Sequence, residues 1–226
     1  MLELSGLLLN KLNLYAAQID TVERTKAGKT KNLFTAGIED FAQAERIYPF
    51  LQYRQPSLKV SIYSYLGHYF GFTGYINPFT AEAHLNINEP MFIKPFVLNH
   101  EIAHQVGYGK ENEASFVSFL ASRESANLHT KYSVYYEMFL SAVRESFIAA
   151  SSQAKLFKEK LHYRVTRDRA FELNWRRQRK NNVQPLVTDF YDNYLRLNNQ
   201  PKGLATYNEV IAWLIAYMKK YGAAAI

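Results

Sequence analysis

Apolar residues recur at helical spacing along most of the C-terminal part of the chain, and this pattern restricts the fold to a mostly helical one. From Pro95 onward, only short polar or glycine-containing stretches interrupt the pattern. It predicts helices over about 96–106, 111–124, 133–150, 153–179, 185–198 and 207–221. Two further helices are expected upstream, over about 2–24 and 38–48, with a polar loop at 27–31 between them.

The segment between these two helical parts has a different character. Residues 58–65 are rich in β-branched and aromatic side chains, and two short extended pieces, 75–80 and 82–86, follow a stretch punctuated by glycines. We therefore expect a small antiparallel sheet before the helix that starts near Phe96. The predicted fold class is α+β, with one mostly helical domain over residues 1–226. Within it we expect N-terminal helices in 1–57, the sheet region in 58–92, a helix pair in 93–126 and C-terminal helices in 127–226.

The composition narrows the chemistry that is open to the chain. Its 226 residues include no cysteine, which excludes disulfides, zinc ribbons and thiol nucleophiles and leaves histidines and carboxylates as the strong metal ligands. We find no Gly-rich phosphate loop and no serine nucleophile elbow. No stretch reaches the roughly 18 uninterrupted apolar residues of a membrane-spanning helix, so we expect the chain itself to be soluble.

The net charge of +7 is concentrated in one part of the sequence. Ten basic residues lie there with few acidic ones: Lys155, Lys158, Lys160, Arg164, Arg167, Arg169, Arg176, Arg177, Arg179 and Lys180. Such a run is typical of the solvated face of long helices, and it is also suited to contact with an anionic surface. No nucleic-acid-binding motif accompanies the charge. If the run has a partner, we expect an anionic membrane surface and no nucleic acid.

The sequence His100-Glu101-Ile102-Ala103-His104 falls within the first of the C-terminal helices. Residues four apart on a helix leave the same face about one turn from each other, so both imidazoles can reach one tetrahedral metal ion. Glu101 follows His100 directly, where it can accept a proton from water that the metal activates without being a ligand itself. The pattern predicts a zinc site with Glu101 as the catalytic base.

A third protein ligand is expected just beyond the second histidine. A glycine turn at 107–109 can end the helix in a left-handed cap, and two carboxylates, Glu111 and Glu113, open the next helix. Glu111 shares a helix face with small residues at 114, 115, 118 and 122, which would let two helices approach closely. Glu113 shares its face with larger apolar residues, so we favour Glu111 as the ligand and keep Glu113 as the alternative. Ser115, one turn beyond Glu111, is a candidate partner for a ligand histidine.

The segment from His100 to Ser115 resembles the zincins, specifically those zinc peptidases whose third ligand is a glutamate on a following helix. Residues 111–115 resemble the Glu-x-x-Ala-Asp/Asn signature of several such families, which implies Glu111 as ligand, with Ser115 in the place of the usual Asp or Asn. A thermolysin-like alignment of residues 112–114 implies Glu113 instead. Lys110 stands where metzincins have their third histidine, so that subgroup does not fit.

Zincins usually carry an extended edge strand before the metal-binding helix, which aligns a peptide substrate by backbone hydrogen bonds. Residues 80–86 occupy that place in the order, and a plain structural hairpin is the alternative. Within that piece, His84 is expected to be a strand-surface residue and not a ligand. A tyrosine or histidine is also needed to stabilise an oxyanion. The tyrosines near the helix pair are candidates that must also serve in packing: Tyr108, Tyr132, Tyr135 and Tyr136.

A resemblance to a second family covers most of the chain. Residues 74–80, the segment 100–115 and the region from Tyr191 to Tyr207 with Gly203 resemble an uncharacterised bacterial membrane-protein family, domain of unknown function 3810. Members of that family carry membrane-spanning segments ahead of a zinc-peptidase-like domain. The resemblance implies a place at the extracytoplasmic face of a bacterial membrane, anchored by segments that this chain does not contain.

These patterns together predict a zinc-dependent hydrolase, a metallopeptidase that cleaves a peptide or protein substrate. Zn²⁺ would be held by His100, His104 and Glu111. The alternative is a non-catalytic, membrane-associated interaction domain with a structural or vestigial zinc site. Hydrolysis of cell-wall material is a third hypothesis, which the sequence does not separate from proteolysis.

Overall fold

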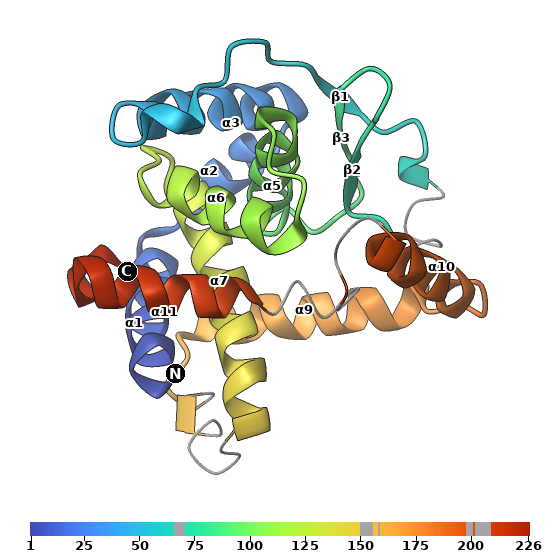
Figure 1. The fold of residues 1–226 in the computed structure, drawn as a ribbon. Coiled ribbons are helices and arrows are strands. Elements are labelled where there is room, and N and C mark those ends of the chain that lie inside the picture. Colours follow the sequence, from blue (N-terminus) through green and yellow to red (C-terminus); the bar gives the residue numbers. More distant parts are fainter. Residues whose placement is uncertain (66–70, 150–155, 158, 198–200, 202–208) are drawn as a thin grey trace.

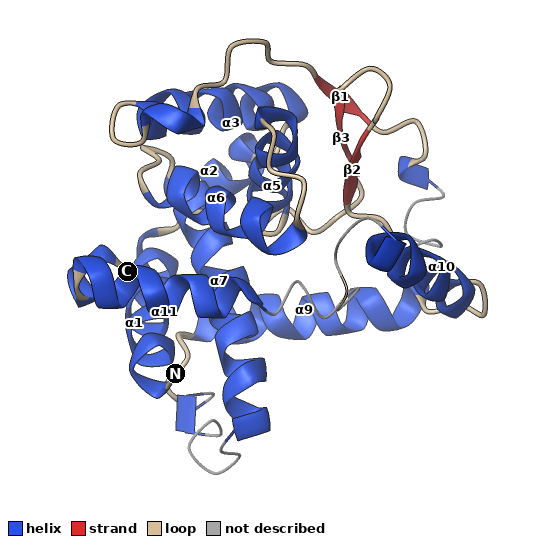
Figure 2. Cartoon of the chain, viewed as in Figure 1, coloured by secondary structure: helices blue, strands red, loops and turns tan. Residues whose placement is uncertain are grey.

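The chain is described by a computed structural model that covers residues 1–65, 71–149, 156–157, 159–197, 201 and 209–226. These residues form a mostly helical α+β fold with three short strands, as the sequence predicts (Figure 2). In chain order the elements are α1 (Leu2–Gln18), α2 (Thr21–Ala27), α3 (Thr30–Glu45), η1 (Pro49–Leu51), β1 (Leu58–Val60), β2 (Gly74–Ile76), β3 (Ala83–Leu85), α5 (Lys94–Val106), α6 (Glu111–Arg123), α7 (Leu128–Ala149), α9 (Tyr163–Arg179), α10 (Gln184–Leu197), α11 (Val210–Tyr221) and η3 (Ala223–Ala225).

Helix α5 carries residues 100–104 and is packed on several sides. It packs against α6, α7, α3 and the strands β2 and β3. Helix α1 packs along α7 through leucines at helical spacing, of which Leu4, Leu8 and Leu12 are fully buried. The core also holds many rings, and the largest fully buried ones are Tyr132, Tyr135, Tyr136, Phe41, Phe119 and Phe139. In Figure 1 the sheet lies beside α5, and α9 leads away from the helical body towards α10.

The three strands form a mixed sheet in the order β1-β3-β2. Strand β2 is antiparallel to β3, as expected, but β1 runs parallel to β3. The main-chain N–H of Ala83 donates to Ser57 and that of Ser61 donates to Leu85, so β3 is hydrogen-bonded on both sides. The prediction that residues 80–86 form the edge strand is therefore wrong, because β1 occupies the second side of β3. The edge strand next to α5 is β2.

Several helix boundaries differ from the predicted ones because partners outside the helix satisfy the backbone. The predicted helix 2–24 is divided, since Asp20 caps α2 by accepting from the N–H groups of Val22 and Glu23. The predicted helix 153–179 is interrupted at residues 160–162, because Asn13 of α1 bonds the main chain of Lys160 and His162 and holds it out of helical geometry; residues 156, 157 and 159 are helical, and α9 begins at Tyr163. Helix α3 begins at Thr30, inside the predicted loop. No helix in the described part of the chain is both long and apolar enough to cross a membrane.

Candidate metal centre

Helix α5 presents both histidines of the motif on one face. Pro95 occupies the first turn of the helix, where its missing N–H costs nothing. The Nε2 atoms of His100 and His104 lie 3.1 Å apart, and both side chains are largely buried. The four-residue spacing thus brings two imidazole nitrogens to one point, as predicted.

The glycine turn then returns the chain to that point. Gly107 ends α5 in the left-handed conformation, with φ of 118°, and its N–H donates to the carbonyl groups of Ala103 and His104. Glu111 is the first residue of α6, and its Oε2 lies 3.0 Å from His100 Nε2 and 3.5 Å from His104 Nε2. One ligand atom from each of these three residues lies within 4.8 Å of the others.

Small residues on α6 allow this close approach of the two helices. Ser115, Ser118 and Ser122 are buried on the face that begins with Glu111. Ser118 donates to the carbonyl oxygen of Phe96, and Asn99 donates to Ser122. The serine face therefore fixes the register of α6 against α5 by hydrogen bonds as well as by size, and the register places Glu111 at the two histidines.

Each histidine of the cluster has a hydrogen-bond partner at its other ring nitrogen, Nδ1. His104 Nδ1 lies 2.7 Å from the carbonyl oxygen of Tyr108, and His100 Nδ1 lies 3.2 Å from the hydroxyl oxygen of Ser115. A carbonyl oxygen only accepts, so Nδ1 of His104 carries the hydrogen, and Nε2 of the neutral ring offers its lone pair to a proton or a metal ion. Such outer partners orient the ring and raise the basicity of a metal ligand.

The electrostatics of the cluster call for a positive charge between its atoms. Burial lowers the pKa of His100. Burial alone would raise the pKa of Glu111, but hydrogen bonds with both histidines hold it well below its usual range. Burial also opposes the charged form of His104, yet the bond to Glu111 and the nearby carboxylates raise its pKa to about 9. A carboxylate and two imidazoles converge here, and either a proton or a metal cation balances them.

Glu101 is buried beside the cluster without joining it. Burial raises the pKa of this carboxyl group to about 8. Strand β2 lies directly over it, since a Cβ atom on Gly74 would come within 2.6 Å of Glu101 Oε1. Only a glycine allows the strand to come this close to the carboxyl group. The carboxyl group of Glu101 therefore lies against Gly74 of β2 and close enough to His104 and Glu111 for their charges to affect its pKa.

The comparison with family models decides where this chain belongs. The model of a family described as protein of unknown function (DUF3810) matches residues 1–215. The chain belongs to this family. Neither the curated proteins nor the solved structures gave a match. Of the segments on which the resemblance to the DUF3810 family depended, Gly203 and Tyr207 lie outside the described residues.

One residue of the centre was missed by reasoning from the sequence. The hydroxyl group of Tyr191, on α10, donates to Glu111 Oε1 over 2.9 Å and so holds the carboxylate oxygen that does not face the histidines. Its ring also meets Phe72 edge-on, 6.4 Å between centroids, just ahead of β2. Tyr191 stands 80 positions from Glu111, and no spacing rule links the two. Only its place at the start of a segment resembling the DUF3810 family pointed to this part of the chain.

The structure places the other candidates of this DUF3810 protein away from the cluster. Glu113, the alternative ligand, pairs with Lys110 on the surface at 3.5 Å. His84 stacks on Tyr75 at 4.7 Å, on the side of β3 opposite to its buried residues. The tyrosines proposed as oxyanion stabilisers have other partners. Tyr132 donates to Asp168, Tyr136 to Glu172 and Tyr135 to the carbonyl oxygen of Ile226. Tyr108 accepts from His104 through its main-chain carbonyl group.

The residues that converge fit a zinc ion by the chemistry of their donor atoms. Two imidazole nitrogens and one carboxylate oxygen are a set that zinc binds tetrahedrally, and such a set leaves one position for water or substrate. Both imidazoles have an outer partner on Nδ1, and the carboxylate has one in Tyr191. In the part of the chain that the structure describes, this is the group of histidine and carboxylate side chains that converges in this way.

Proposed function

We propose that this chain is a zinc-dependent hydrolase that cleaves peptide bonds, with Glu101 as general base and then general acid. The observation that carries the proposal is the convergence of His100, His104 and Glu111 within 4.8 Å, beside a buried carboxyl group that is not a ligand. Two nitrogens, one oxygen and an adjacent carboxyl group are the parts that zinc-assisted hydrolysis needs.

The chemistry divides between the ion and the side chains of the chain. A zinc ion in this cluster would polarise the substrate carbonyl and make water more acidic. Glu101 would accept the proton from the attacking water and deliver it to the leaving amine. The buried position of Glu101 under Gly74 favours this role. Burial disfavours the charged carboxylate and raises the pKa of the group, which makes the carboxylate a stronger base. Tyr108 and Ser115 keep the histidine rings in place during the reaction.

A peptide is the substrate class that the sheet supports. The main-chain N–H of Asn86 donates to the carbonyl oxygen of Thr73, and the main-chain N–H of Asn77 donates to that of Glu82. Alternate residues of this strand, 73, 75 and 77, therefore direct their backbone groups to β3. The backbone groups of Gly74 and Ile76 then point to the other edge of β2. An extended peptide can add to that edge by hydrogen bonds, with its backbone next to Glu101. In this proposal β2, and not the segment 80–86, aligns the extended peptide substrate.

The number of protein ligands separates catalysis from a structural role. Structural zinc sites are normally closed by four protein ligands, whereas catalytic sites keep one position for water or substrate. Among the described residues the cluster supplies three ligands. This count favours the hydrolase over a non-catalytic interaction domain. It does not distinguish a protein substrate from cell-wall material, so the hydrolysis assay must include both.

We keep contact with an anionic membrane, at the extracytoplasmic face of a bacterium, as a separate proposal. It is supported by exposed cations such as Arg167 on α9, for which no ion pair is found in the described residues. The structure assigns other members of the basic run to the fold itself, since Arg169 and Arg176 both pair with Glu172. Co-sedimentation with anionic and neutral vesicles tests this, and equal binding to both would contradict it.

The hydrolase is tested by separating metal binding from chemistry. We expect Glu101→Gln to keep one zinc per chain and to lose hydrolysis of a peptide library by a factor of about 10² or more, because the proton acceptor is gone. Glu111→Ala should weaken zinc binding by more than the roughly 10–100-fold that loss of an outer partner costs. Glu113→Ala is the matched control and should leave both properties unchanged.

Two outcomes would contradict the assignments. Loss of zinc from Glu101→Gln would make Glu101 a ligand and not a base. Zinc binding that responds to Glu113→Ala and not to Glu111→Ala would show that the wrong carboxylate was chosen. A wild-type chain that binds zinc tightly and cleaves neither peptides nor purified cell wall would support the interaction domain instead.

A further inference from the structure

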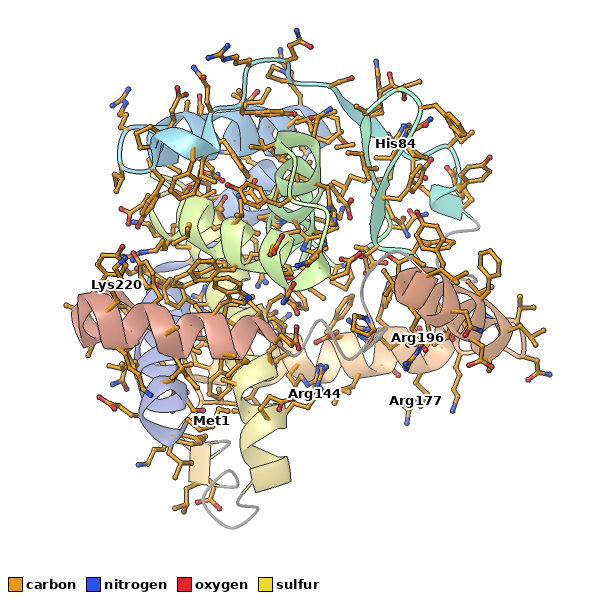
Figure 3. The ribbon with its side chains drawn as sticks, in the orientation of Figure 1. Met1, His84, Arg144, Arg177, Arg196 and Lys220 are labelled. Atoms are coloured by element: carbon orange, nitrogen blue, oxygen red, sulfur yellow. The ribbon has the colours of Figure 1, made fainter. Side chains whose placement is uncertain are left out.

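A basic pocket of about 370 Å³ lies between the end of α9, the start of α10 and the segment that leads into β2. Ligand pockets typically occupy roughly 300–1,000 Å³, so it is large enough for a small group or part of a larger molecule. Figure 3 marks Arg177 on α9 and Arg196 on α10, the helices at this end of the molecule. The pocket is lined by Gly71, Thr73, Glu89, Trp175, Arg176, Arg177, Arg179, Lys180 and Gln184.

The charges around this pocket are unbalanced. Arg176 is used by the fold, since its Nε donates to Glu172 over 2.7 Å. Arg177, Arg179 and Lys180 form no ion pair with any carboxylate of the described chain. Glu89 is the carboxylate in the lining, and its burial raises its pKa to about 7, so near neutral pH it offers only part of a negative charge. The lining thus has an excess of positive charge.

Arg179 is fixed in place and yet incompletely bonded. Its guanidinium group lies 4.3 Å from the centre of the Trp175 ring, and one Nη donates to the carbonyl oxygen of Trp175. Its Nε is buried without a hydrogen-bond partner. A buried donor without a partner is costly, and a charged donor more so. The side chain is therefore held ready for an acceptor that the described residues do not provide.

The pocket adjoins the metal centre through two short connections. Thr73 lines the pocket, and the next residue, Gly74, lies against Glu101. Phe72, between two lining residues, contacts the ring of Tyr191, whose hydroxyl group bonds Glu111. One molecule lying along the edge of β2 could thus contact both the pocket and the centre.

We propose that this pocket is a subsite for an anionic group, a carboxylate or a phosphate, carried by the molecule whose scissile bond lies at the metal centre. The guanidinium of Arg179 offers a planar donor that suits either group, and Lys180 adds a mobile charge. As a statement about substrates, the subsite rests on the proposed hydrolase. Anion binding itself requires only the lining residues of the pocket. Anion binding and hydrolysis can therefore be tested separately.

Anion binding is measured directly through Trp175, which lies in the pocket. The chain has two tryptophans, so Trp213→Phe leaves Trp175 as the only tryptophan, and selective excitation of tryptophan avoids the emission of the tyrosines. We expect inorganic phosphate and N-acetylglycine, titrated separately into metal-free protein, to change the emission saturably and to bind less well as salt is raised. The anion that binds with the higher affinity shows whether the pocket prefers a phosphate or a carboxylate.

Substitutions then locate the binding. Arg179→Gln and Lys180→Gln should each weaken binding about tenfold or more, because a charge-assisted bond is lost. Lys180 is exposed, so its variant folds even if the loss of Arg179 disturbs α9. Glu89→Gln should strengthen binding, since it removes the opposing carboxylate. Arg167→Gln, the same change on an exposed residue of α9 away from the pocket, is the control and should bind like the parent.

The outcomes separate the subsite from the hydrolase. With peptides that carry a free carboxylate, Lys180→Gln should raise KM and leave kcat unchanged, and amide-capped peptides should not respond. Anion binding that depends on Arg179 and Lys180 in a chain that cleaves nothing would overturn the hydrolase and leave the anion site standing. Hydrolysis together with equal anion binding by Arg179→Gln, Lys180→Gln and Arg167→Gln would overturn the subsite alone.

Discussion

His104 donates its Nδ1 hydrogen to the carbonyl oxygen of Tyr108, so its Nε2 faces the cluster with a lone pair whenever the ring is neutral. That lone pair meets Nε2 of His100 at 3.1 Å and Oε2 of Glu111 at 3.5 Å. When neither Nε2 carries a hydrogen, three acceptors this close repel one another unless a cation lies between them. A proton balances part of this charge, and a divalent ion bound by all three atoms balances more of it. Zinc should therefore stabilise the folded chain by mass action.

Substitution of Tyr191 tests whether a hydrogen bond to Glu111 contributes to zinc affinity. Its hydroxyl group holds the carboxylate oxygen that points away from the histidines. We expect Tyr191→Phe to lower zinc affinity about tenfold, at the weaker end of the 10–100-fold range for such partners, because Glu111 loses a hydrogen bond that orients its carboxylate. Competition with a chelator of known affinity measures the change.

Tyr221→Phe is the control for Tyr191→Phe, because it removes an exposed tyrosine hydroxyl on α11. If both variants keep the affinity of the wild type, the hydrogen bond from Tyr191 does not contribute to zinc binding. A loss of hydrolysis in Tyr191→Phe with unchanged zinc affinity would move Tyr191 from positioning the ligand to contacting the substrate.

At the scale of elements, the approach of β2 to α5 decides where the carboxyl group of Glu101, the proposed general base, lies. A Cβ atom at position 74 would meet Oε1, Cδ and Cγ of Glu101 at 2.6, 2.9 and 2.8 Å. Gly74→Ala must therefore displace either the side chain or the strand. We expect kcat to fall about tenfold or more with little change in zinc affinity, and the free energy of unfolding to fall by roughly 1–3 kcal/mol.

Gly109→Ala makes the same chemical change in the turn between α5 and α6, where an added Cβ meets no atom within 4 Å. It should leave kcat and stability close to those of the wild type. Equal effects of the two substitutions on kcat would mean that the contact between β2 and Glu101 has no part in the reaction.

The sequence predicted the elements that depend on local rules. The helix with His100 and His104, the left-handed glycine that ends it and the small-residue face of α6 follow from spacing and from side-chain size. What depends on distant partners was not predicted. Residues 160–162 are non-helical because Asn13 bonds their backbone, and β3 became the central strand because β1 pairs with its second side. Tyr191 reaches Glu111 through the packing of α10, which periodicity does not encode.

At the scale of the whole molecule, three buried carboxyl groups outside the metal centre share one property. Burial raises the pKa of Asp40 to about 6 and those of Glu89 and Glu137 to about 7. A carboxyl group whose folded pKa exceeds its unfolded value binds its proton more tightly in the folded state. Its contribution to stability is therefore full at pH values below the unfolded pKa and is lost as the pH rises through the folded pKa.

Asp40 allows this to be measured at one position, between α3 and α5, where Asn99 donates to its carboxyl group over 2.9 Å. Its pKa rises from 3.8 to about 6, so the wild type should lose up to about 3 kcal/mol of unfolding free energy between pH 4 and 8, relative to Asp40→Asn. Urea unfolding of both chains at several pH values gives this difference. Asp189→Asn, at an exposed site on α10, is the control, and its difference in unfolding free energy from the wild type should not change with pH. A constant difference between wild type and Asp40→Asn across this range would show that Asp40 keeps its charge in the folded chain.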